Sequence, residues 1–293
     1  MPPRTPRYLA LAACVFVTAC RGSDVNGRVS ANPDPVARVV IDAMGTRHEL
    51  EQPARRVVSL VPSATETLRA IGASDALVGR TDYDTQAWAA GIPSVGGGLE
   101  PNLEALVSLR PDVVIRFGGE QDPRTPERLD DLGIRHVAVR PVALADLFET
   151  NRIVGEVVGR EAESDALSHA IRAGLEGLAA ATASLPRVRV AYVLGGSPPW
   201  VAGPGTYISQ VLDLVGGDNV FSDLRAPYSA VSPEELRSRD VDVVIVSSAG
   251  SFDESLTPNA RLEVVGDDFE VPGPGVIAAA RRIAEVVHGR PIG

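Results

Sequence analysis

An internal repeat constrains the fold of this chain more than any other feature. Residues 102–115 align without gaps on residues 232–245, and seven of the 14 positions are identical. Each copy joins a short helical pattern to the apolar run Asp-Val-Val-Ile. Similarity of this kind indicates that one supersecondary unit occurs twice. The sequence therefore predicts two similar halves rather than one irregular domain.

The segments that precede the two copies also match each other. In each half a short apolar run is followed by a helical pattern and then by a glycine, the usual stop of a helix. The matched runs are 57–61 and 188–194, the matched helices are 63–71 and 207–215, and the glycines are Gly72 and Gly216. Residues 63–66 and 232–235 are typical capping boxes at helix starts.

The apolar runs are short, rich in β-branched residues and nearly continuous, which is typical of buried parallel strands. We therefore expect an α/β fold of two Rossmann-like lobes, each with a mainly parallel sheet. Helical spacing continues through the proline-free middle of the chain, with a break near Gly159. The expected organisation is an N-terminal lobe at 38–142, a helical connection with a long backbone helix at 143–184, and a C-terminal lobe at 185–293.

The first residues of the chain have the pattern of an export signal. Arg4 and Arg7 precede an apolar run, residues 8–19, of about 12 residues, whereas a membrane-spanning helix needs about 20. Residues 17–20, Val-Thr-Ala-Cys, resemble the lipobox of bacterial lipoproteins, which implies cleavage before Cys20 and acylation of its thiol. Cys14 in a similar string and a plain secretory signal are the alternatives. Residues 21–37 are rich in Gly, Ser, Asn and Pro and are expected to be a tether.

Composition excludes several classes of function. All 28 cationic residues are arginines, so a Walker P-loop and Schiff-base catalysis by lysine are excluded. A net charge of −10 disfavours nucleic acid as a partner. The four histidines have no metal-ligand spacing, and we expect no resident metal or cofactor. An exported α/β enzyme is the alternative of another class, but the chain lacks a Gly-x-Ser-x-Gly elbow and a Gly-x-Gly-x-x-Gly motif.

Several aromatic residues follow predicted strands. Open α/β sheets bind ligands beyond the carboxyl ends of their strands, and flat rings suit a large, partly apolar macrocycle. The candidate ligand-binding aromatics are Tyr83, Phe117, Trp200 and Tyr228. Arg80 and Arg116 are expected in loops at the same cleft, where they would neutralise carboxylates of a ligand. A role in surface solvation is the alternative for both arginines.

Glu104 and Glu234 occupy equivalent places in the repeat, each at the second position of a predicted helix. A carboxylate in a first helical turn offsets the helix dipole by about 0.3–1 kcal/mol. That structural role is one interpretation of the pair, and a functional role shared by the two halves is the other.

Taken together, these motifs resemble the periplasmic binding proteins for cobalamin and iron chelates. The resemblance rests on residues 56–66, 102–115, 216–221 and 231–236 and extends over about residues 36–288. It implies two lobes with a ligand cleft between them, no catalysis, and delivery of the ligand to the permease of an ABC importer. It also implies that Glu104 and Glu234 dock onto arginines of that permease, and that Trp200 and Tyr228 match aromatic ligand-contact positions of the cobalamin binders.

Two segments depart from the family pattern and bear on the ligand. Glycines occupy 96–98, near where the cobalamin binders often carry a tryptophan, and Gly275 stands where an arginine is usual. We expect cobalamin as cargo, with a ferric siderophore or haem as alternatives. A sensor or scaffold that kept the fold without transport is a further alternative. The protein is expected to be an exported monomer, lipid-anchored at the outer face of the cytoplasmic membrane or in the periplasm.

Overall fold

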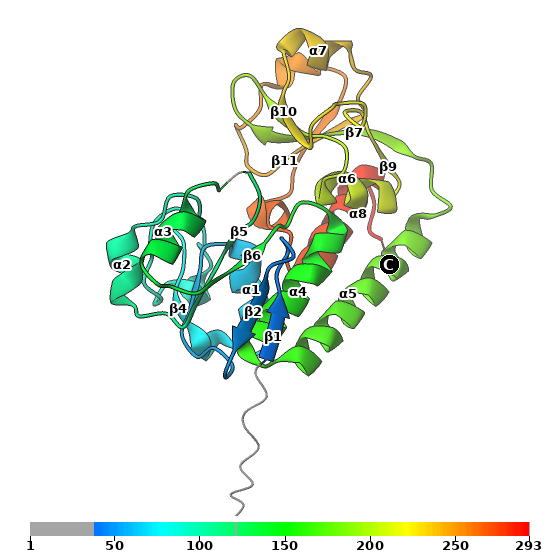
Figure 1. The fold of residues 1–293 in the computed structure, drawn as a ribbon. Coiled ribbons are helices and arrows are strands. Elements are labelled where there is room, and N and C mark those ends of the chain that lie inside the picture. Colours follow the sequence, from blue (N-terminus) through cyan, green and yellow to red (C-terminus); the bar gives the residue numbers. More distant parts are fainter. Residues whose placement is uncertain (1–37, 121, 293) are drawn as a thin grey trace, which may run out of the picture. The chain divides into compact units, whose positions relative to one another are not determined.

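The computed structural model describes residues 38–120 and 122–292, all within one compact unit of the chain that begins at Pro35 (Figure 1). The expected signal, Cys20 and the tether at 21–37 lie outside the described residues. Within the described ranges, no helix combines the length and the apolar character that crossing a membrane requires.

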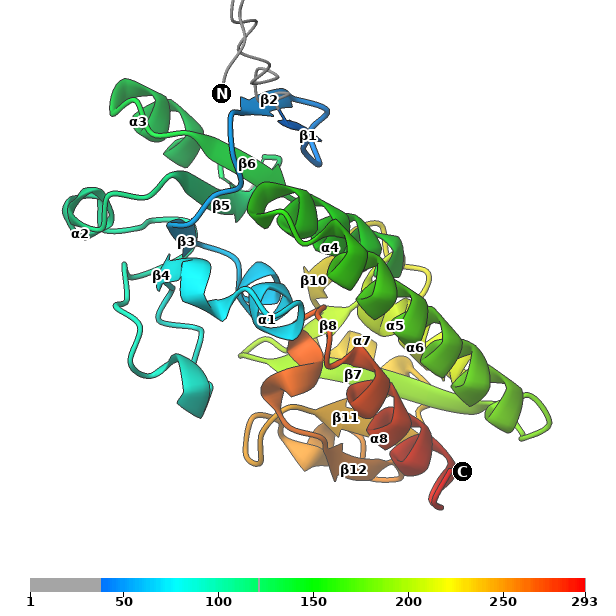
Figure 2. The same cartoon turned by 90° about the horizontal axis from the view of Figure 1, so that it is seen from below.

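The N-terminal half begins with a hairpin and continues into a four-stranded parallel sheet of order β4-β3-β5-β6, which Figure 2 shows. Helices α1 and α4 cover one face of this sheet, and α2 and α3 cover the other. The strands are β1 (Arg38–Ile41), β2 (Arg47–Leu50), β3 (Val57–Ser59), β4 (Leu77–Gly79), β5 (Val113–Phe117) and β6 (His136–Val139). The helices are α1 (Pro62–Ala70), α2 (Leu103–Ser108) and α3 (Thr125–Asp131), with 3-10 turns η1 (Ser74–Ala76) and η2 (Ala87–Ala89).

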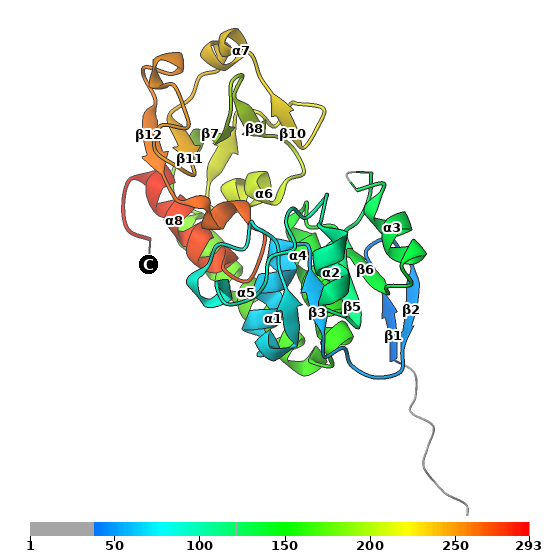
Figure 3. The same ribbon diagram turned by 90° about the vertical axis from the view of Figure 1, so that its left-hand side faces the viewer.

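The C-terminal half is a sheet of order β10-β8-β7-β11-β12, visible in that order in Figure 3, with β9 also paired to β7. Strands β9, β7, β11 and β12 run parallel, whereas β8 and β10 add an antiparallel edge. The strands are β7 (Val188–Gly195), β8 (Trp200–Ala202), β9 (Gly217–Asn219), β10 (Tyr228–Ala230), β11 (Val243–Val246) and β12 (Arg261–Val264). The helices are α6 (Tyr207–Leu214), α7 (Pro233–Ser238) and α8 (Val276–His288), with 3-10 turns η3 (Glu254–Leu256) and η4 (Asp267–Glu270).

Two helices, α4 (Leu144–Val158) and α5 (Glu161–Thr182), connect the halves and lie side by side (Figure 2). Helix α4 contributes to both cores, because Leu147 packs with the C-terminal sheet while Ile153 and Val157 pack with the N-terminal sheet. Gly159 ends α4 with a left-handed backbone at φ 69°. The expected two-lobed α/β fold and the expected helix break at Gly159 are both confirmed.

The repeat is also visible in local geometry. Asn102 and Ser232 cap α2 and α7 by accepting hydrogen bonds from backbone amides three residues ahead, each at 3.1 Å. The sequence of buried and exposed side chains is identical over residues 101–110 and 231–240. The capping box expected at Ser63 is wrong, because α1 already begins at Pro62 and Ser63 is buried in its first turn. Proline suits the first helical position, where no amide hydrogen bond is lost.

Candidate functional site

A groove of about 740 Å³ is lined by residues from both halves of the chain. The N-terminal half contributes the turn between β1 and β2 and the segments that follow β5 and β6. The C-terminal half contributes residues of β8 and β10 and the proline before β10. The groove thus lies at the carboxyl ends of N-terminal parallel strands, where open α/β sheets bind ligands.

Three of the expected aromatics line this groove, namely Phe117, Trp200 and Tyr228. Phe117 is the last residue of β5. Trp200 and Tyr228 lie on the paired antiparallel strands β8 and β10, where Trp200 is opposite Ala230 and Tyr228 is opposite Ala202. Residues paired or two apart share a face of a sheet, so both aromatics project from the same face. Their direct partners are alanines, which leaves the space above them to a ligand.

The two C-terminal aromatics differ in exposure and so in chemistry. Trp200 is 49% exposed, which is unusual for an indole and leaves its face open to a ligand. Tyr228 is half-buried, and burial together with the nearby Glu270 raises the pKa of its hydroxyl to about 12. The hydroxyl therefore stays protonated near neutral pH and can donate a hydrogen bond to a ligand.

The other three expected residues are not among those that line the groove. Tyr83 lies outside the lining of the groove and is 68% exposed. Arg80 is partly buried, and its guanidinium donates to the carbonyls of Thr81 at 2.7 Å and Ala89 at 2.9 Å. The structure does not test a ligand role for these residues, which stays a prediction.

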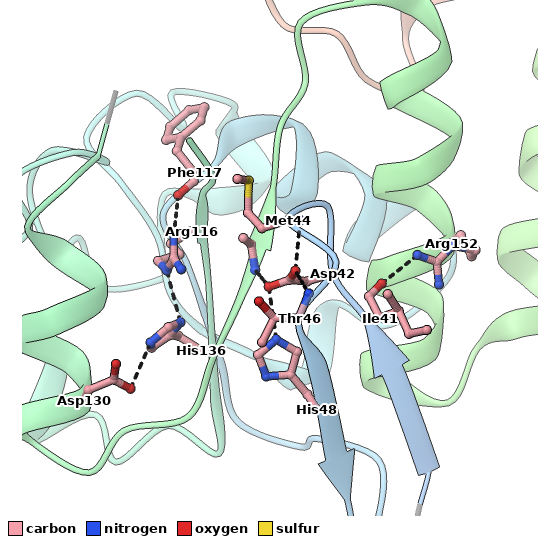
Figure 4. Close-up of polar contacts among 11 residues, drawn as sticks. Ile41, Asp42, Met44, Thr46, His48, Arg116, Phe117, Asp130, His136 and Arg152 are labelled. Atoms are coloured by element: carbon pink, nitrogen blue, oxygen red, sulfur yellow. Dashed lines mark hydrogen bonds and ion pairs between the residues drawn. The ribbon is translucent and has the colours of Figure 1, made fainter. Parts of the chain in front are cut away.

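The expected loop position of Arg116 is wrong, because β5 extends two residues further than the apolar pattern indicated. Its guanidinium is buried, and Nε donates to Nδ1 of His136 at 3.0 Å while Nη1 donates to the carbonyl of Phe117 at 2.7 Å (Figure 4). Burial lowers the pKa of Arg116, although Asp122, Asp42 and Asp130 act in the opposite direction. Arg116 thus holds the backbone of an aromatic that lines the groove.

Sequence reasoning missed three polar or adaptable residues of the groove: Met44, Glu120 and Arg140. Arg140 is exposed and directly follows β6, a strand that the sequence patterns did not predict, so the rule that found Phe117 did not reach Arg140. Met44 lies in the turn of the β1–β2 hairpin, an element that the sequence patterns did not predict.

Glu104 and Glu234 are each the second residue of a helix, as expected, and both are exposed. The side chain of Glu234 is 80% exposed, with the guanidinium of Arg237 3.8 Å away. Both carboxylates are therefore accessible to a partner, and an exposed pair such as Glu234–Arg237 contributes little to stability.

Comparisons with known proteins were consistent with this geometry. Residues 57–264 match the family model described as "Periplasmic binding protein". A cobalamin-binding protein of Halobacterium salinarum is 29% identical over 276 residues, which cover 86% of this chain and 74% of that protein.

Two solved structures of similar fold belong to proteins that are named for different ligands. The periplasmic vitamin B12 binding protein BtuF of Vibrio cholerae has a TM-score of 0.71 and 25% identity, covering 80% of this chain and 97% of that one. A periplasmic heme binding protein from Pseudomonas aeruginosa has a TM-score of 0.72 and 24% identity, covering 82% and 95%. The latter likeness concerns the fold alone.

Proposed function

Because this chain belongs to the periplasmic binding protein family, we propose that it captures a corrinoid such as cobalamin in the groove between its lobes. The observation that carries this proposal is the convergence of Phe117, Trp200 and Tyr228 from three strands on one groove. Each fully covered ring buries about 150–250 Å², and flat rings match the flat, partly apolar face of a corrin. The names of relatives, among them the cobalamin-binding protein of Halobacterium salinarum, support the same ligand class.

The test is a calorimetric titration of the soluble chain from Ser23 onward, which retains the whole compact unit. We expect saturable binding of cyanocobalamin with a Kd below about 10 μM, or about −6.8 kcal/mol. Trp200→Ala should weaken binding at least about tenfold, since alanine removes most of the aromatic contact. Leu132→Ala is the matched control, because Leu132 is an apolar residue that is 47% exposed and does not line the groove. Absence of saturable cobalamin binding would contradict the corrinoid assignment.

Haem or a ferric siderophore is the second candidate, and Arg140 favours it. This exposed guanidinium lines the groove, and arginine pairs well with carboxylates, which haem and many siderophores carry. Titrations with hemin and ferric siderophores compare these ligands directly. Tighter binding of one of them, lost in Arg140→Gln, would replace the corrinoid as cargo.

Delivery to the permease of an ABC importer is the second half of the proposed function. We place the docking contacts at Glu104 and Glu234, one exposed carboxylate on each half of the chain. Such pairs with permease arginines would orient the protein more than they would tighten binding. A single chain supplies both carboxylates, so we propose that it acts as a monomer, which sedimentation of the soluble chain would check.

The proposal also includes export and a lipid anchor on Cys20, which holds the protein at the outer face of the cytoplasmic membrane or in the periplasm. The export-signal pattern and the lipobox-like residues 17–20 support it. Full-length protein should partition into detergent and gain the mass of a lipid, whereas Cys20→Ser should be found without lipid. Lipid-free wild-type protein would contradict the anchor.

A further inference from the structure

The β1–β2 hairpin places Ala43 and Met44 in the wall of the groove, although it precedes residues 57–264, which match the family model. We infer that this hairpin is a third wall of the ligand site, beside the segments that follow β5 and β6 and the strands β8 and β10. Met44 is then a ligand contact, and Asp42 is the residue that positions it. The inference rests on the proposed function, because it assigns further residues to the same groove.

Asp42 holds the turn in shape through both of its carboxylate oxygens. Oδ1 accepts hydrogen bonds from the backbone amides of Met44 and Thr46, each at 2.9 Å. Oδ2 lies 3.0 Å from Nε2 of His48 (Figure 4) and accepts from the amide of Ala138 at 3.2 Å. The carboxylate is buried, so each of these bonds is shielded from water. One side chain therefore shapes the turn and also ties it to β6.

Two further contacts fix the hairpin to the rest of the molecule. The amide of Ala43 donates to the carbonyl of Ala138 at 3.0 Å. On the other side, Nη2 of Arg152 in α4 donates to the carbonyl of Ile41 at 2.7 Å. Figure 1 shows β1 beside α4. The turn is thus anchored to β6 and to α4, the helix shared by both cores.

Met44 packs over a glycine that directly follows β5. A Cβ atom added to Gly118 would lie 2.9 Å from Sδ of Met44 and 3.2 Å from Cβ of Ala138. Only glycine leaves room for the thioether at this place without displacement. Figure 4 shows the side chains of Met44 and Phe117 pointing the same way, away from His48 and His136.

The side chain of Met44 is suited to contact a macrocycle. It is 51% exposed although it is apolar, as is the neighbouring groove residue Trp200 at 49%. A thioether is polarisable and flexible, so it adapts to an irregular ligand face and interacts well with delocalised rings. We therefore assign Met44 to the contact with the flat face of the bound macrocycle.

Methyl NMR tests the contact directly, because Met44 is the only methionine after Met1. The soluble chain from Ser23 onward, labelled with methyl-¹³C methionine, is titrated with cyanocobalamin and, in parallel, with hemin. Met44→Leu assigns the resonance by removing it. We expect the Met44 methyl resonance to shift with saturation for the ligand that binds. A resonance unmoved by a ligand that calorimetry shows to bind would overturn the inference.

The ligand affinities of single and double variants separate the contact role of Met44 from the positioning role of Asp42. Met44→Ala should weaken binding about five- to tenfold, whereas Met44→Leu, of similar volume, should stay within about threefold. Asp42→Asn replaces Oδ2 by an amide that cannot accept from Ala138 and should weaken binding about threefold or more. In the Met44→Ala background it should add no further loss, because positioning residues act through the residue they place.

The outcomes distinguish this inference from the proposed function. If the wild type binds a ligand and Met44→Ala binds it with the same affinity, the hairpin is not a wall of the site, and the proposed function still stands. Additive losses in the double variant overturn the positioning role of Asp42. Absence of binding by the wild type to cyanocobalamin, hemin and ferric siderophores overturns the proposed function and the inference with it. Asp75→Asn, an exposed aspartate in η1, is the matched control and should leave affinity unchanged.

Discussion

Arg116 illustrates how a single charged residue is accommodated in a buried parallel strand. Its Nε–H donates to Nδ1 of His136, so that nitrogen carries no proton. On the far side of the ring, Nε2 lies 3.2 Å from the carboxylate of Asp130. Burial and the adjacent guanidinium lower the pKa of His136, against the opposing effect of Asp130. A neutral histidine thus links a buried cation to an exposed carboxylate.

Asp42 makes a pH-dependent contribution to stability. Burial alone would raise the pKa of its carboxyl, but hydrogen bonds from His48 and three backbone amides outweigh burial and lower the pKa below 3.8. A lowered pKa in the folded state stabilises the protein above the unfolded pKa, and this stability is lost as the pH falls through the folded value. We expect Asp42→Asn to reduce the free energy of unfolding by about 1–3 kcal/mol at pH 7.

This difference between wild type and Asp42→Asn should shrink when urea unfolding is repeated near pH 3. Asp75→Asn, with its exposed side chain, should follow the wild type at both pH values. A difference that is the same at pH 7 and pH 3 would contradict the charged, hydrogen-bonded role of Asp42.

The predictability of the elements followed the strength of their patterns. Continuous apolar runs predicted β3, β5, β7 and β11, and the helical periods predicted α4, α5 and the break at Gly159. The short strand β8 was missed because Gly and Pro surround it and it is only three residues long. The β1–β2 hairpin was missed because its strands are four residues each and only Val40 and Leu50 are buried.

The strength of the sequence patterns also explains how much of the site was predictable. Phe117, Trp200 and Tyr228 were found because aromatics are rare in this chain and these three lie next to strong strand or helix signals. Met44 was not, because its place in the groove depends on long-range contacts of Asp42 with Ala138 and of Ile41 with Arg152. Such contacts leave no periodic signal in the sequence.

The break between α4 and α5 depends on the backbone of Gly159. Its φ is +69°, and an added Cβ would lie 2.8 Å from Cγ of Pro53. A left-handed conformation costs an alanine about 1–2 kcal/mol, so Gly159→Ala should lower the free energy of unfolding by about that amount or more. Gly177→Ala is the matched control within α5, where an added Cβ meets nothing within 4 Å. It should be neutral or stabilising by up to about 1 kcal/mol.

Urea unfolding of the two glycine variants measures this difference. If Gly159→Ala and Gly177→Ala prove equally stable, the left-handed residue is not what ends α4.

At the scale of the whole molecule, the described part of the chain combines two repeated sheets with one shared helix. Leu147 of α4 belongs to the C-terminal core and Ile153 to the N-terminal core. Moving one lobe against the other would therefore require α4 to leave one of two close-packed interiors. We infer that ligand binding involves small adjustments at the groove more than a wide hinge motion.

The repeat also brings one exposed carboxylate to the same place on each half, and this pair should govern transport but not binding. The double variant Glu104→Gln with Glu234→Gln removes both charges and keeps the side-chain lengths. We expect uptake of labelled cobalamin to fall at least about tenfold in cells whose only binding protein is this full-length chain. The Kd of the soluble chain should stay within about twofold, since neither glutamate lines the groove.

A matched control separates docking from a general loss of charge and of helix stability. Glu176→Gln with Glu254→Gln removes the same charge from exposed positions in α5 and η3 and should transport normally. The docking variant loses about 0.3–1 kcal/mol of helix-dipole stabilisation at each helix, too little to unfold a domain with typical stability. Equal uptake by both double variants would therefore assign Glu104 and Glu234 to the helix starts alone. Loss of uptake confined to the first variant would assign them to the permease.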